Sequence, residues 1–245
     1  MEQLIVYQSP YNKCRIGPKE DGGYVICEME GDYDAFLSGG IANDIRFEMA
    51  LLDKYPDLYC LAFDGTINNL PTYNPRIIFY KKNLGAQETD NMTNLSKFLR
   101  GKNDVFLKMD IEGHEFRIIP SLISSGDIQK VKQLVLEIHT PADIHLFPDY
   151  FRGLSDITQQ TMDIMLEGIN KTHRLVHLHG NNGCKIHERD GQLVPNVFEC
   201  TFIRKSDLPD DFAWERNRDA IPSKLDYPNV PFKPELQLKG YPWTV

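Results

Sequence analysis

Hydrophobic runs alternate with amphipathic stretches along most of the chain, from about Tyr33 to Lys205. Short apolar runs rich in β-branched and aromatic residues predict buried strands, and the stretches between them have the spacing of crossover helices. The pattern therefore predicts a mostly parallel sheet. Its seven expected strands are Ala35–Leu37, Leu58–Phe63, Arg76–Phe79, Val105–Met109, Gln133–Ile138, Leu175–His179 and Val197–Ile203.

Helices are predicted between several of these strands. In Asp44–Lys54 apolar residues recur at helical spacing, and Asp44 is a residue type that caps helices. Leu154–Ile169 repeats the same spacing. A further helix is expected over Glu115–Ser124, where Pro120 should shorten or kink it.

The last two strands differ from the others. Only a short stretch of Gly, Asn and charged residues separates His179 from Val197, which suits an antiparallel hairpin better than a helical crossover. After Lys205, the sequence is polar and contains many prolines and aromatic residues. We therefore expect one α/β domain over residues 1–205, with residues 1–33 as an N-terminal capping segment. Residues 206–245 should form a tail that packs on the domain through its aromatic side chains.

Composition narrows the class of protein further. The 245 residues are 41% hydrophobic and 25% charged, as in an ordinary globular domain with an appendage. With 35 acidic and 27 basic side chains the formal charge is -8, which disfavours nucleic acid as a partner. Five widely spaced cysteines form no disulfide framework and favour a reducing, cytoplasmic location. No segment has the run of about 18 apolar residues that a membrane span needs, so none is expected.

The first candidate for chemistry is a glycine turn. Ser38, Gly39 and Gly40 lead from a strand into a helix, and such small residues let a ligand approach the backbone at the carboxyl edge of a sheet. Asp64, followed by Gly65, ends the next strand at a spacing that suits an acidic residue bound to ribose hydroxyls. A turn that merely ends a strand, with Asp64 starting a surface loop, is the alternative interpretation.

A second group of candidates lies where two later strands end. Lys108, Asp110 and Glu112 share parity, so in an extended chain they lie on one side. In the next strand Glu137 and His139 again share parity. Burying these groups is costly unless they pair with one another or bind a metal, so the cluster indicates a functional site. A solvated rim of charge is the alternative.

A family resemblance follows from these residues. The run Leu107–Glu115 reads Leu-Lys-Met-Asp-Ile-Glu-Gly-His-Glu and is followed by Leu136–His139. It resembles the Lys-hydrophobic-Asp-hydrophobic-Glu-Gly-x-Glu stretch of FkbM-type methyltransferases and related proteins that use S-adenosylmethionine (SAM). Arg15–Val25 and Ser38–Ile41, with Phe47-Glu48, resemble the same group, so the similarity covers roughly residues 14–140.

The resemblance implies a Rossmann-like, seven-stranded methyltransferase fold whose sheet ends in the antiparallel hairpin. It also implies SAM as cofactor, with Asp64 at the ribose and Asp110 facing the methyl donor and acceptor. The residues that would border SAM are Ser38, Gly39, Gly40, Ala42, Asp44, Asp64, Gly65 and Asp110. The sequence departs from the family at Ser38, where an acidic residue is usual, and at Ala42 and Asp44, which replace later glycines.

For the reaction, the resemblance implies transfer of a methyl group to a hydroxyl, which we expect to belong to a sugar in a glycan or glycoside. The enzyme has chiefly to place the acceptor oxygen behind the methyl group and exclude water. A base has to take the hydroxyl proton, and the available catalytic groups are Asp110, Glu112, His114 and His139.

A metal ion is a further expectation. The strands that end in Asp110 and in Glu137 and His139 should be neighbours, and two carboxylates with an imidazole suit Mg²⁺ or Mn²⁺. The alternative is a mutual hydrogen bond between Glu137 and His139.

Two other stretches are candidates for the acceptor pocket. His177–Gly183 offers imidazoles and amides that suit sugar hydroxyls. Pro141–Gly153 carries aromatic residues that either cover a sugar ring or simply pack a loop.

Other functions remain open at this point. The same machinery could methylate a small metabolite or a peptide group. A non-catalytic adenosine-binding scaffold would use the sheet edge and the tail for partners, but it has no need of clustered buried charge. A dehydrogenase would explain Asp64 but neither the Asp-Ile-Glu-Gly-His-Glu run nor the terminal hairpin.

Overall fold

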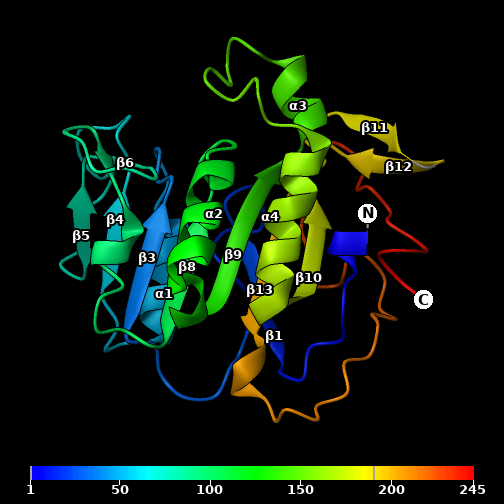
Figure 1. The fold of residues 1–245 in the computed structure, drawn as a ribbon, viewed down its shortest axis with the longest axis horizontal. Coiled ribbons are helices and arrows are strands. Elements are labelled where there is room, and N and C mark those ends of the chain that lie inside the picture. Colours follow the sequence, from blue (N-terminus) through cyan, green and yellow to red (C-terminus); the bar gives the residue numbers. More distant parts are fainter. Residues whose placement is uncertain (1, 190) are drawn as a thin grey trace.

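The computed structural model describes residues 2–189 and 191–245 and has a seven-stranded sheet at its centre (Figure 1). All seven predicted strands are present, with ends that differ by a few residues. From one edge of the sheet to the other they are β10 (His173–Gly180), β13 (Val197–Arg204), β9 (Val131–His139), β8 (Val105–Met109), β3 (Ala35–Gly39), β4 (Cys60–Phe63) and β5 (Ile77–Tyr80).

The sheet is parallel except at β13. That strand runs antiparallel to both of its neighbours, β9 and β10, so the predicted terminal hairpin is confirmed. The connection between β10 and β13 holds a small antiparallel sheet of its own, β11 (Ile186–Arg189) and β12 (Gln192–Pro195). The parallel strands all end at the upper edge in Figure 1, where α3 (Pro141–Leu146) and the β11–β12 hairpin also lie.

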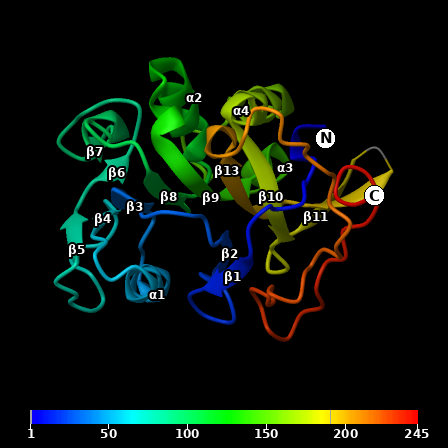
Figure 2. The ribbon, with the colours of Figure 1, turned by 90° about the horizontal axis from the view of Figure 1, so that it is seen from below.

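Both faces of the sheet are covered. Helices α2 (Glu115–Ser125) and α4 (Gln159–Thr172) lie on one face, and α1 (Arg46–Lys54) lies on the other, together with the β1–β2 hairpin and the end of the chain (Figure 2). Every residue of β8 and β9 is buried. This explains why the strands appear in the sequence as continuous apolar runs rather than as alternating ones.

Shorter elements complete the structure. They are η1 (Glu2–Leu4), β1 (Lys13–Ile16), β2 (Tyr24–Cys27), β6 (Asn83–Leu84), β7 (Met92–Thr93), η2 (Leu95–Lys97), η3 (Asp127–Lys130) and η4 (Lys205–Asp207).

Two helix starts differ from the prediction. Helix α1 begins at Arg46, after an N-cap at Ile45, and Asp44 instead accepts a hydrogen bond from the backbone N–H of Arg46 in a turn before the helix (2.8 Å). Helix α4 begins at Gln159, because Thr158 caps it in a reciprocal pair with Thr161. Leu154 and Ile157, before Thr158, are buried in the core although they are not helical. Their apolar spacing therefore comes from packing in the core and not from a helix.

Pro120 does not shorten α2. The helix runs through it from Glu115 to Ser125 and ends at Gly126, which has a left-handed conformation. Phe116, Ile119 and Leu122 are buried against the sheet, while Pro120 is exposed. Burial of the apolar face therefore outweighs the loss of one backbone hydrogen bond.

The C-terminal tail lies against the domain through some of its aromatic residues. Trp243 is buried and contacts Phe198 of β13, with ring centroids 5.6 Å apart. Trp214 contacts Tyr7 near the start of the chain (6.0 Å). Phe232, in contrast, is 87% exposed, so the expectation that the aromatic residues pack is met only in part.

All five cysteines are free. In the described part of the chain, no helix combines the length and the apolar character needed to cross a bilayer.

Candidate active site

The glycine turn joins three strand ends at the carboxyl edge of the sheet. The backbone N–H of Gly40 donates to the carbonyl of Phe63 (3.0 Å), and that of Asp110 donates to the carbonyl of Gly39 (3.1 Å). Gly40 has φ +78°, and a Cβ there would lie 1.6 Å from the Asp110 carbonyl oxygen. Only glycine fits, because the turn packs directly on the end of β8.

Asp64 holds the other side of this turn. Its Oδ2 accepts hydrogen bonds from the backbone N–H groups of Ile41 (3.0 Å) and Ala42 (2.8 Å), and its Oδ1 accepts from the N–H and hydroxyl of Thr66. Burial alone would raise the pKa of Asp64, but these hydrogen bonds outweigh it and lower the pKa. Asp64 and Asp110 therefore flank the same glycine turn, and Asp64 fixes the turn's shape.

Two buried ionisable side chains, Glu48 of α1 and Lys108 of β8, lie next to the turn. The Ser38 hydroxyl donates to Glu48 Oε1 of α1 (2.6 Å), and both residues are buried. Lys108 Nζ donates to the Gly40 carbonyl (3.0 Å). Burial raises the pKa of Glu48, although Lys108 acts in the opposite direction. A carboxylate from α1 thus lies next to Ser38, at the position where the family usually has an acidic residue.

The remaining predicted cofactor residues lie around the turn. Gly65 donates its backbone N–H to the side-chain oxygen of Asn83 (2.9 Å), a residue that the sequence did not single out. Asp44 forms an exposed ion pair with Arg46 (2.7 Å). Ala42 has a positive φ of 46°, which is uncommon for a residue with a side chain.

Asp110 is the centre of a charged cluster that is partly buried. The Tyr24 hydroxyl donates to its Oδ2 (2.8 Å), and Lys108 Nζ lies 3.8 Å from the same oxygen. Burial would raise the pKa of Asp110, but Lys108, a hydrogen bond with Glu137 and the Tyr24 hydroxyl lower it. Burial and the nearby Asp110 raise the pKa of Glu137 well above its usual value. Of this pair, Asp110 is therefore the group that more readily ionises, and Glu137 the one that more readily holds a proton.

His139 lies among three carboxyl groups. Its Nδ1 is 2.8 Å from Asp143 Oδ2, and its Nε2 is 3.2 Å from Oε2 of both Glu112 and Glu137. Burial would lower the pKa of His139, but the three carboxyl groups outweigh it and raise the pKa far above the usual value. The surrounding carboxyl groups thus favour the protonated form of the imidazole. Nε2 is buried and makes no well-aligned hydrogen bond within the described residues.

Several members of this cluster were not found by sequence reasoning. Asp143 follows His139 by four positions at the start of α3, and that spacing is the only local signal for it. Asn181 donates to Glu137 Oε1 (3.1 Å), and Asn196 donates to Asp143 Oδ1 (3.3 Å). Both asparagines come from the β10–β13 connection, far along the chain, so their contacts depend on the sheet order.

Three of the predicted histidines lie outside the cluster. His114 precedes α2 and takes part in none of the cluster's ion pairs within residues 2–189 and 191–245. His177 contacts Asp226 of the tail (2.8 Å), and His179 contacts Glu199 (3.0 Å). The two β10 imidazoles do not line the cavity described below, because the tail covers the edge strand and pairs with them.

The predicted metal set, Asp110, Glu137 and His139, lies in one cluster, but the structure gives a metal ion no support there. No group of three or more His, Cys, Asp or Glu side chains is arranged to hold one in the part of the chain that the structure describes. Nδ1 of His139 lies 2.8 Å from Asp143 Oδ2, and its Nε2 lies 3.2 Å from Glu137 Oε2.

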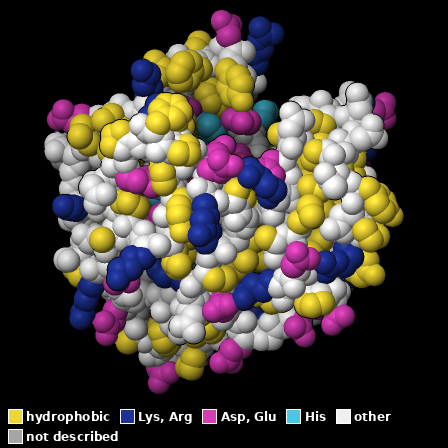
Figure 3. Space-filling model, turned by 180° about the vertical axis from the view of Figure 1, so that it is seen from behind, with side chains coloured by type: hydrophobic (Ala, Val, Ile, Leu, Met, Phe, Trp, Pro, Cys, Tyr) yellow, Lys and Arg dark blue, Asp and Glu magenta, His cyan; other side chains and the backbone are white. Residues whose placement is uncertain are grey.

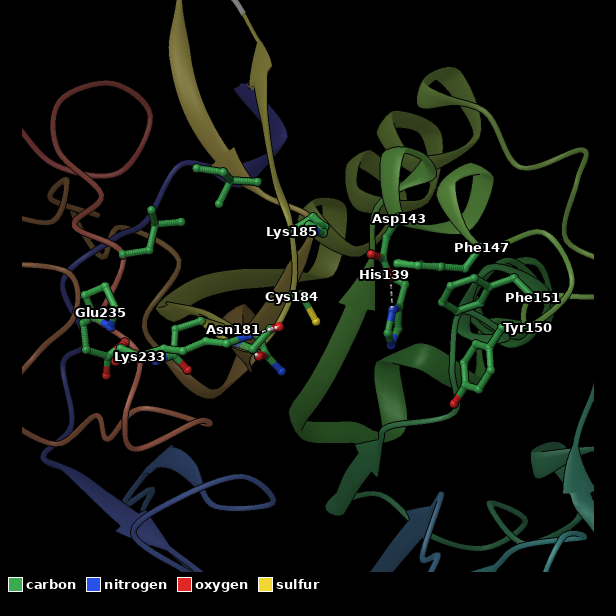
Figure 4. Close-up of a pocket in the computed structure, with 15 residues that line it drawn as sticks. His139, Asp143, Phe147, Tyr150, Phe151, Asn181, Cys184, Lys185, Lys233 and Glu235 are labelled. Atoms are coloured by element: carbon green, nitrogen blue, oxygen red, sulfur yellow. Dashed lines mark hydrogen bonds and ion pairs between the residues drawn. The ribbon is translucent and has the colours of Figure 1, made fainter.

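A cavity of about 750 Å³ opens beside His139 and Asp143. Figure 4 shows the aromatic side chains of Phe147, Tyr150 and Phe151 on one side of it, and Asn181, Lys233 and Glu235 on the other. In the space-filling view, histidine side chains lie deep between a hydrophobic group and acidic side chains (Figure 3). The predicted loop Pro141–Gly153 therefore does contribute to the cavity wall.

The fold and site define the class of protein. The reversed strand β13 between β9 and β10, with a glycine turn and acidic residues at the carboxyl edge, is the arrangement of a Rossmann-like, SAM-dependent methyltransferase. The family model of the methyltransferase FkbM domain matches residues 34–161, just over half of the chain. The chain belongs to the FkbM methyltransferase domain family.

Comparison with other proteins adds solved structures of low similarity. No curated protein sequence gives a match. A chain of the fibrillarin/Nop5p complex is 12% identical, with 72% of this chain and 74% of that chain covered and a TM-score of 0.42. The plantazolicin methyltransferase BpumL, bound to a monoazolic desmethylPZN analogue and SAH, is 9% identical, with 72% and 77% covered and a TM-score of 0.38. A fibrillarin pre-rRNA processing protein of Methanococcus jannaschii is 10% identical, with 71% and 67% covered and a TM-score of 0.37. Such distant likenesses say nothing about the substrate.

The residues at the carboxyl edge fit SAM. The Gly39–Gly40 turn is held against the ends of β4 and β8 by backbone hydrogen bonds, and a side chain at Gly40 would displace it from β8. SAM carries one net positive charge, and the carboxyl groups of Asp110, Glu112 and Asp143 lie at this edge together with Lys108 and His139.

Proposed function

We propose that this methyltransferase is an O-methyltransferase that acts on a hydroxyl of a sugar in a glycan or glycoside. The cavity beside His139 is the observation that carries the proposal. Its inner end adjoins the charged cluster, and the flat faces of Phe147, Tyr150 and Phe151 suit the apolar face of a sugar ring. An acceptor in this cavity would present a hydroxyl to the edge where β8 and β9 end.

When bound, SAM supplies an electrophilic methyl group on a positively charged sulfur. The chain's own contribution is to position it. We assign the glycine turn at Gly39–Gly40 and the backbone around Gly65 to the cofactor, and we assign Asp64 to keeping the turn in shape beside the ribose. Asp110, held as a carboxylate by Lys108, would face the methyl donor.

Glu112 is the group we assign as the base for the acceptor hydroxyl. Glu137 accepts from Asn181, Asp143 is bonded to His139 and Asn196, and Asp110 accepts from Tyr24. The Glu112 side chain is 51% exposed, in contrast to the 10% of Glu137, and it lies at the edge of the cluster. An accessible carboxylate can receive the proton as the oxygen attacks the methyl group.

His139 has a different role in this proposal. The carboxyl groups around His139 raise its pKa and favour the protonated form, which donates hydrogen bonds instead of accepting a proton. Asp143 orients the ring through Nδ1, and Nε2 has no well-aligned partner within the described residues. We therefore assign His139 to holding Glu112 and an acceptor oxygen in place.

The substitution Glu112→Gln tests the proposal. Turnover should fall by about 10²- to 10³-fold, because the base is lost while the shape is kept. The affinity for S-adenosylhomocysteine, measured by calorimetry, should stay the same. Glu167→Gln, on the exposed face of α4, is the matched control and should leave both unchanged.

The acceptor class is tested with radiolabelled SAM and a panel of glycosides, small metabolites and peptides. Methylation of a sugar hydroxyl that stops when that hydroxyl is replaced by hydrogen is the expected result. Transfer only to a metabolite or a peptide, with every glycoside inert, would overturn the sugar assignment.

A further inference from the structure

The acceptor cavity is larger than a single sugar requires. Its volume of about 750 Å³ lies in the range of about 300–1,000 Å³ that holds drug-sized ligands. Only its inner end, at His139 and Asp143, adjoins the charged cluster. The rest of the space must therefore take a part of the acceptor that does not react.

The polar side chains of the outer cavity are already paired within the protein. The Asn182 amide donates to the carbonyls of Val230 (3.1 Å) and Lys233 (3.0 Å), and its oxygen accepts from the Val230 N–H (2.9 Å). Lys233 Nζ donates to the Gly183 carbonyl (3.0 Å).

Two further polar side chains are paired in the same way. Glu235 lies 3.2 Å from His179, and the Asn181 amide is bonded to Glu137. A second sugar ring in this space would lose its hydrogen bonds to water and find few replacements, which is unfavourable. Lys185 is the exception, and it is exposed.

Apolar side chains line the same space and reach solvent at its opening. Phe147 is 47% exposed and Tyr150 is 65% exposed on the side of α3, and Ile186 of β11 is 48% exposed on the other side. Leu236 of the tail also lines the cavity. These residues come from separate elements that converge on one opening. Such a cluster of exposed apolar groups marks a binding surface.

We propose that the acceptor is amphiphilic: its sugar lies at His139, and an apolar aglycone extends outward between Phe147 and Ile186. This inference rests on the proposed function and adds the class of glycoside. The aglycone is an alkyl chain or a ring system of similar polarity. It displaces water from Phe147, Tyr150, Ile186 and Leu236 without breaking the hydrogen bonds that hold the tail in place.

Binding of alkyl β-D-glucosides tests the inference directly. Calorimetry on the full chain saturated with S-adenosylhomocysteine would compare glucosides with chains of increasing length, each below its micelle concentration. The affinity should rise by roughly threefold for each added methylene until the cavity is filled. An affinity that does not change with chain length would overturn the inference.

Matched variants locate the effect. Phe147→Ala and Ile186→Ser should flatten the dependence on chain length. Leu146→Ala and Leu193→Ser are the controls, because these neighbours are also about half exposed, at 50% and 58%, but do not line the cavity. If the controls reduce the dependence as much as Phe147→Ala and Ile186→Ser do, the chain binds elsewhere and the inference fails.

The outcome also separates this inference from the proposed function. Methylation of sugar hydroxyls at rates independent of chain length would leave the proposed function intact and overturn the amphiphilic acceptor. Chain-dependent binding together with transfer only to hydroxyls of apolar alcohols or phenols would keep the apolar subsite and overturn the sugar at His139.

Discussion

The two regions that we propose to bind the donor and the acceptor are built in different ways. The donor edge is the turn with the strand ends at Gly40, Asp64 and Asp110, which are held by bonds to backbone groups within the family-matched range 34–161. The acceptor cavity combines the loop after β9 with residues 181–186 and 233–236, and the last two segments lie outside that range. In our proposal the donor is thus bound by a turn inside the family-matched range, and the acceptor is recognised largely by side chains outside it.

The largest effect is expected at the donor edge, for Gly40→Ala. The added Cβ would lie 1.6 Å from the Asp110 carbonyl oxygen, so the turn must leave β8. We expect S-adenosylhomocysteine affinity to fall by at least about 100-fold, or about 3 kcal/mol, in calorimetry.

Gly126→Ala is the matched control, since Gly126 has the same φ of +78° with nothing within 4 Å of an added Cβ. Gly126→Ala should lower the free energy of unfolding by about 1 kcal/mol, because alanine is strained in the left-handed conformation. Equal loss of binding in both variants would show that contact with β8 is not the cause.

A smaller effect concerns the pH dependence of folding near the donor edge. Glu115 accepts from the Ile111 N–H (2.9 Å), and burial raises the pKa of this carboxyl to about 7. The unfolded chain loses this proton near the ordinary value, so the contribution of Glu115 to stability is present below about pH 4.5 and is lost as the pH rises toward 7.

Glu115→Gln removes this dependence because glutamine does not ionise. The stability of the variant relative to the wild type should rise by at most about 3 kcal/mol between about pH 4.5 and pH 8. Urea unfolding at both pH values measures the change. A constant difference between the two proteins would mean that Glu115 titrates normally in the folded state.

At the acceptor cavity, Asn182→Ala should produce a moderate and selective effect. It removes the hydrogen bonds that hold Val230 and Lys233 against the β10–β13 connection. We expect the acceptor KM to rise about tenfold, with kcat and the affinity for S-adenosylhomocysteine unchanged. Asn170→Ala, which removes a side-chain hydrogen bond to the Gln3 carbonyl at the other end of the sheet, is the control. If Asn182→Ala weakens both ligands equally, the two regions are not independent.

The smallest expected effect is that of chelation. The carboxylates and imidazole of Asp110, Glu137 and His139 are paired with one another rather than arranged around an ion. Methyl transfer should therefore stay within about twofold after exhaustive treatment with EDTA, measured with radiolabelled SAM. Loss of activity that Mg²⁺ or Mn²⁺ restores would contradict this.

The sequence by itself determined the donor edge. Strand positions follow from local apolar runs, and the ends of neighbouring parallel strands necessarily meet at one edge of the sheet. This is why Gly40, Asp64 and Asp110 could be brought together before their contacts were known. The convergence of Asp110 with Glu137 and His139 follows from the same pairing of β8 with β9.

Only the tertiary structure decided the pKa shifts and the cavity beside His139. Three carboxyl groups around His139 raise its pKa, and two of them are bonded to Asn181 and Asn196 of the β10–β13 connection, whose position depends on strand order. His177 and His179 of β10 do not line the pocket predicted for them, because the tail covers this edge strand. Electrostatic shifts and cavities arise from side chains that are distant in sequence, and no local pattern encodes which of them will meet.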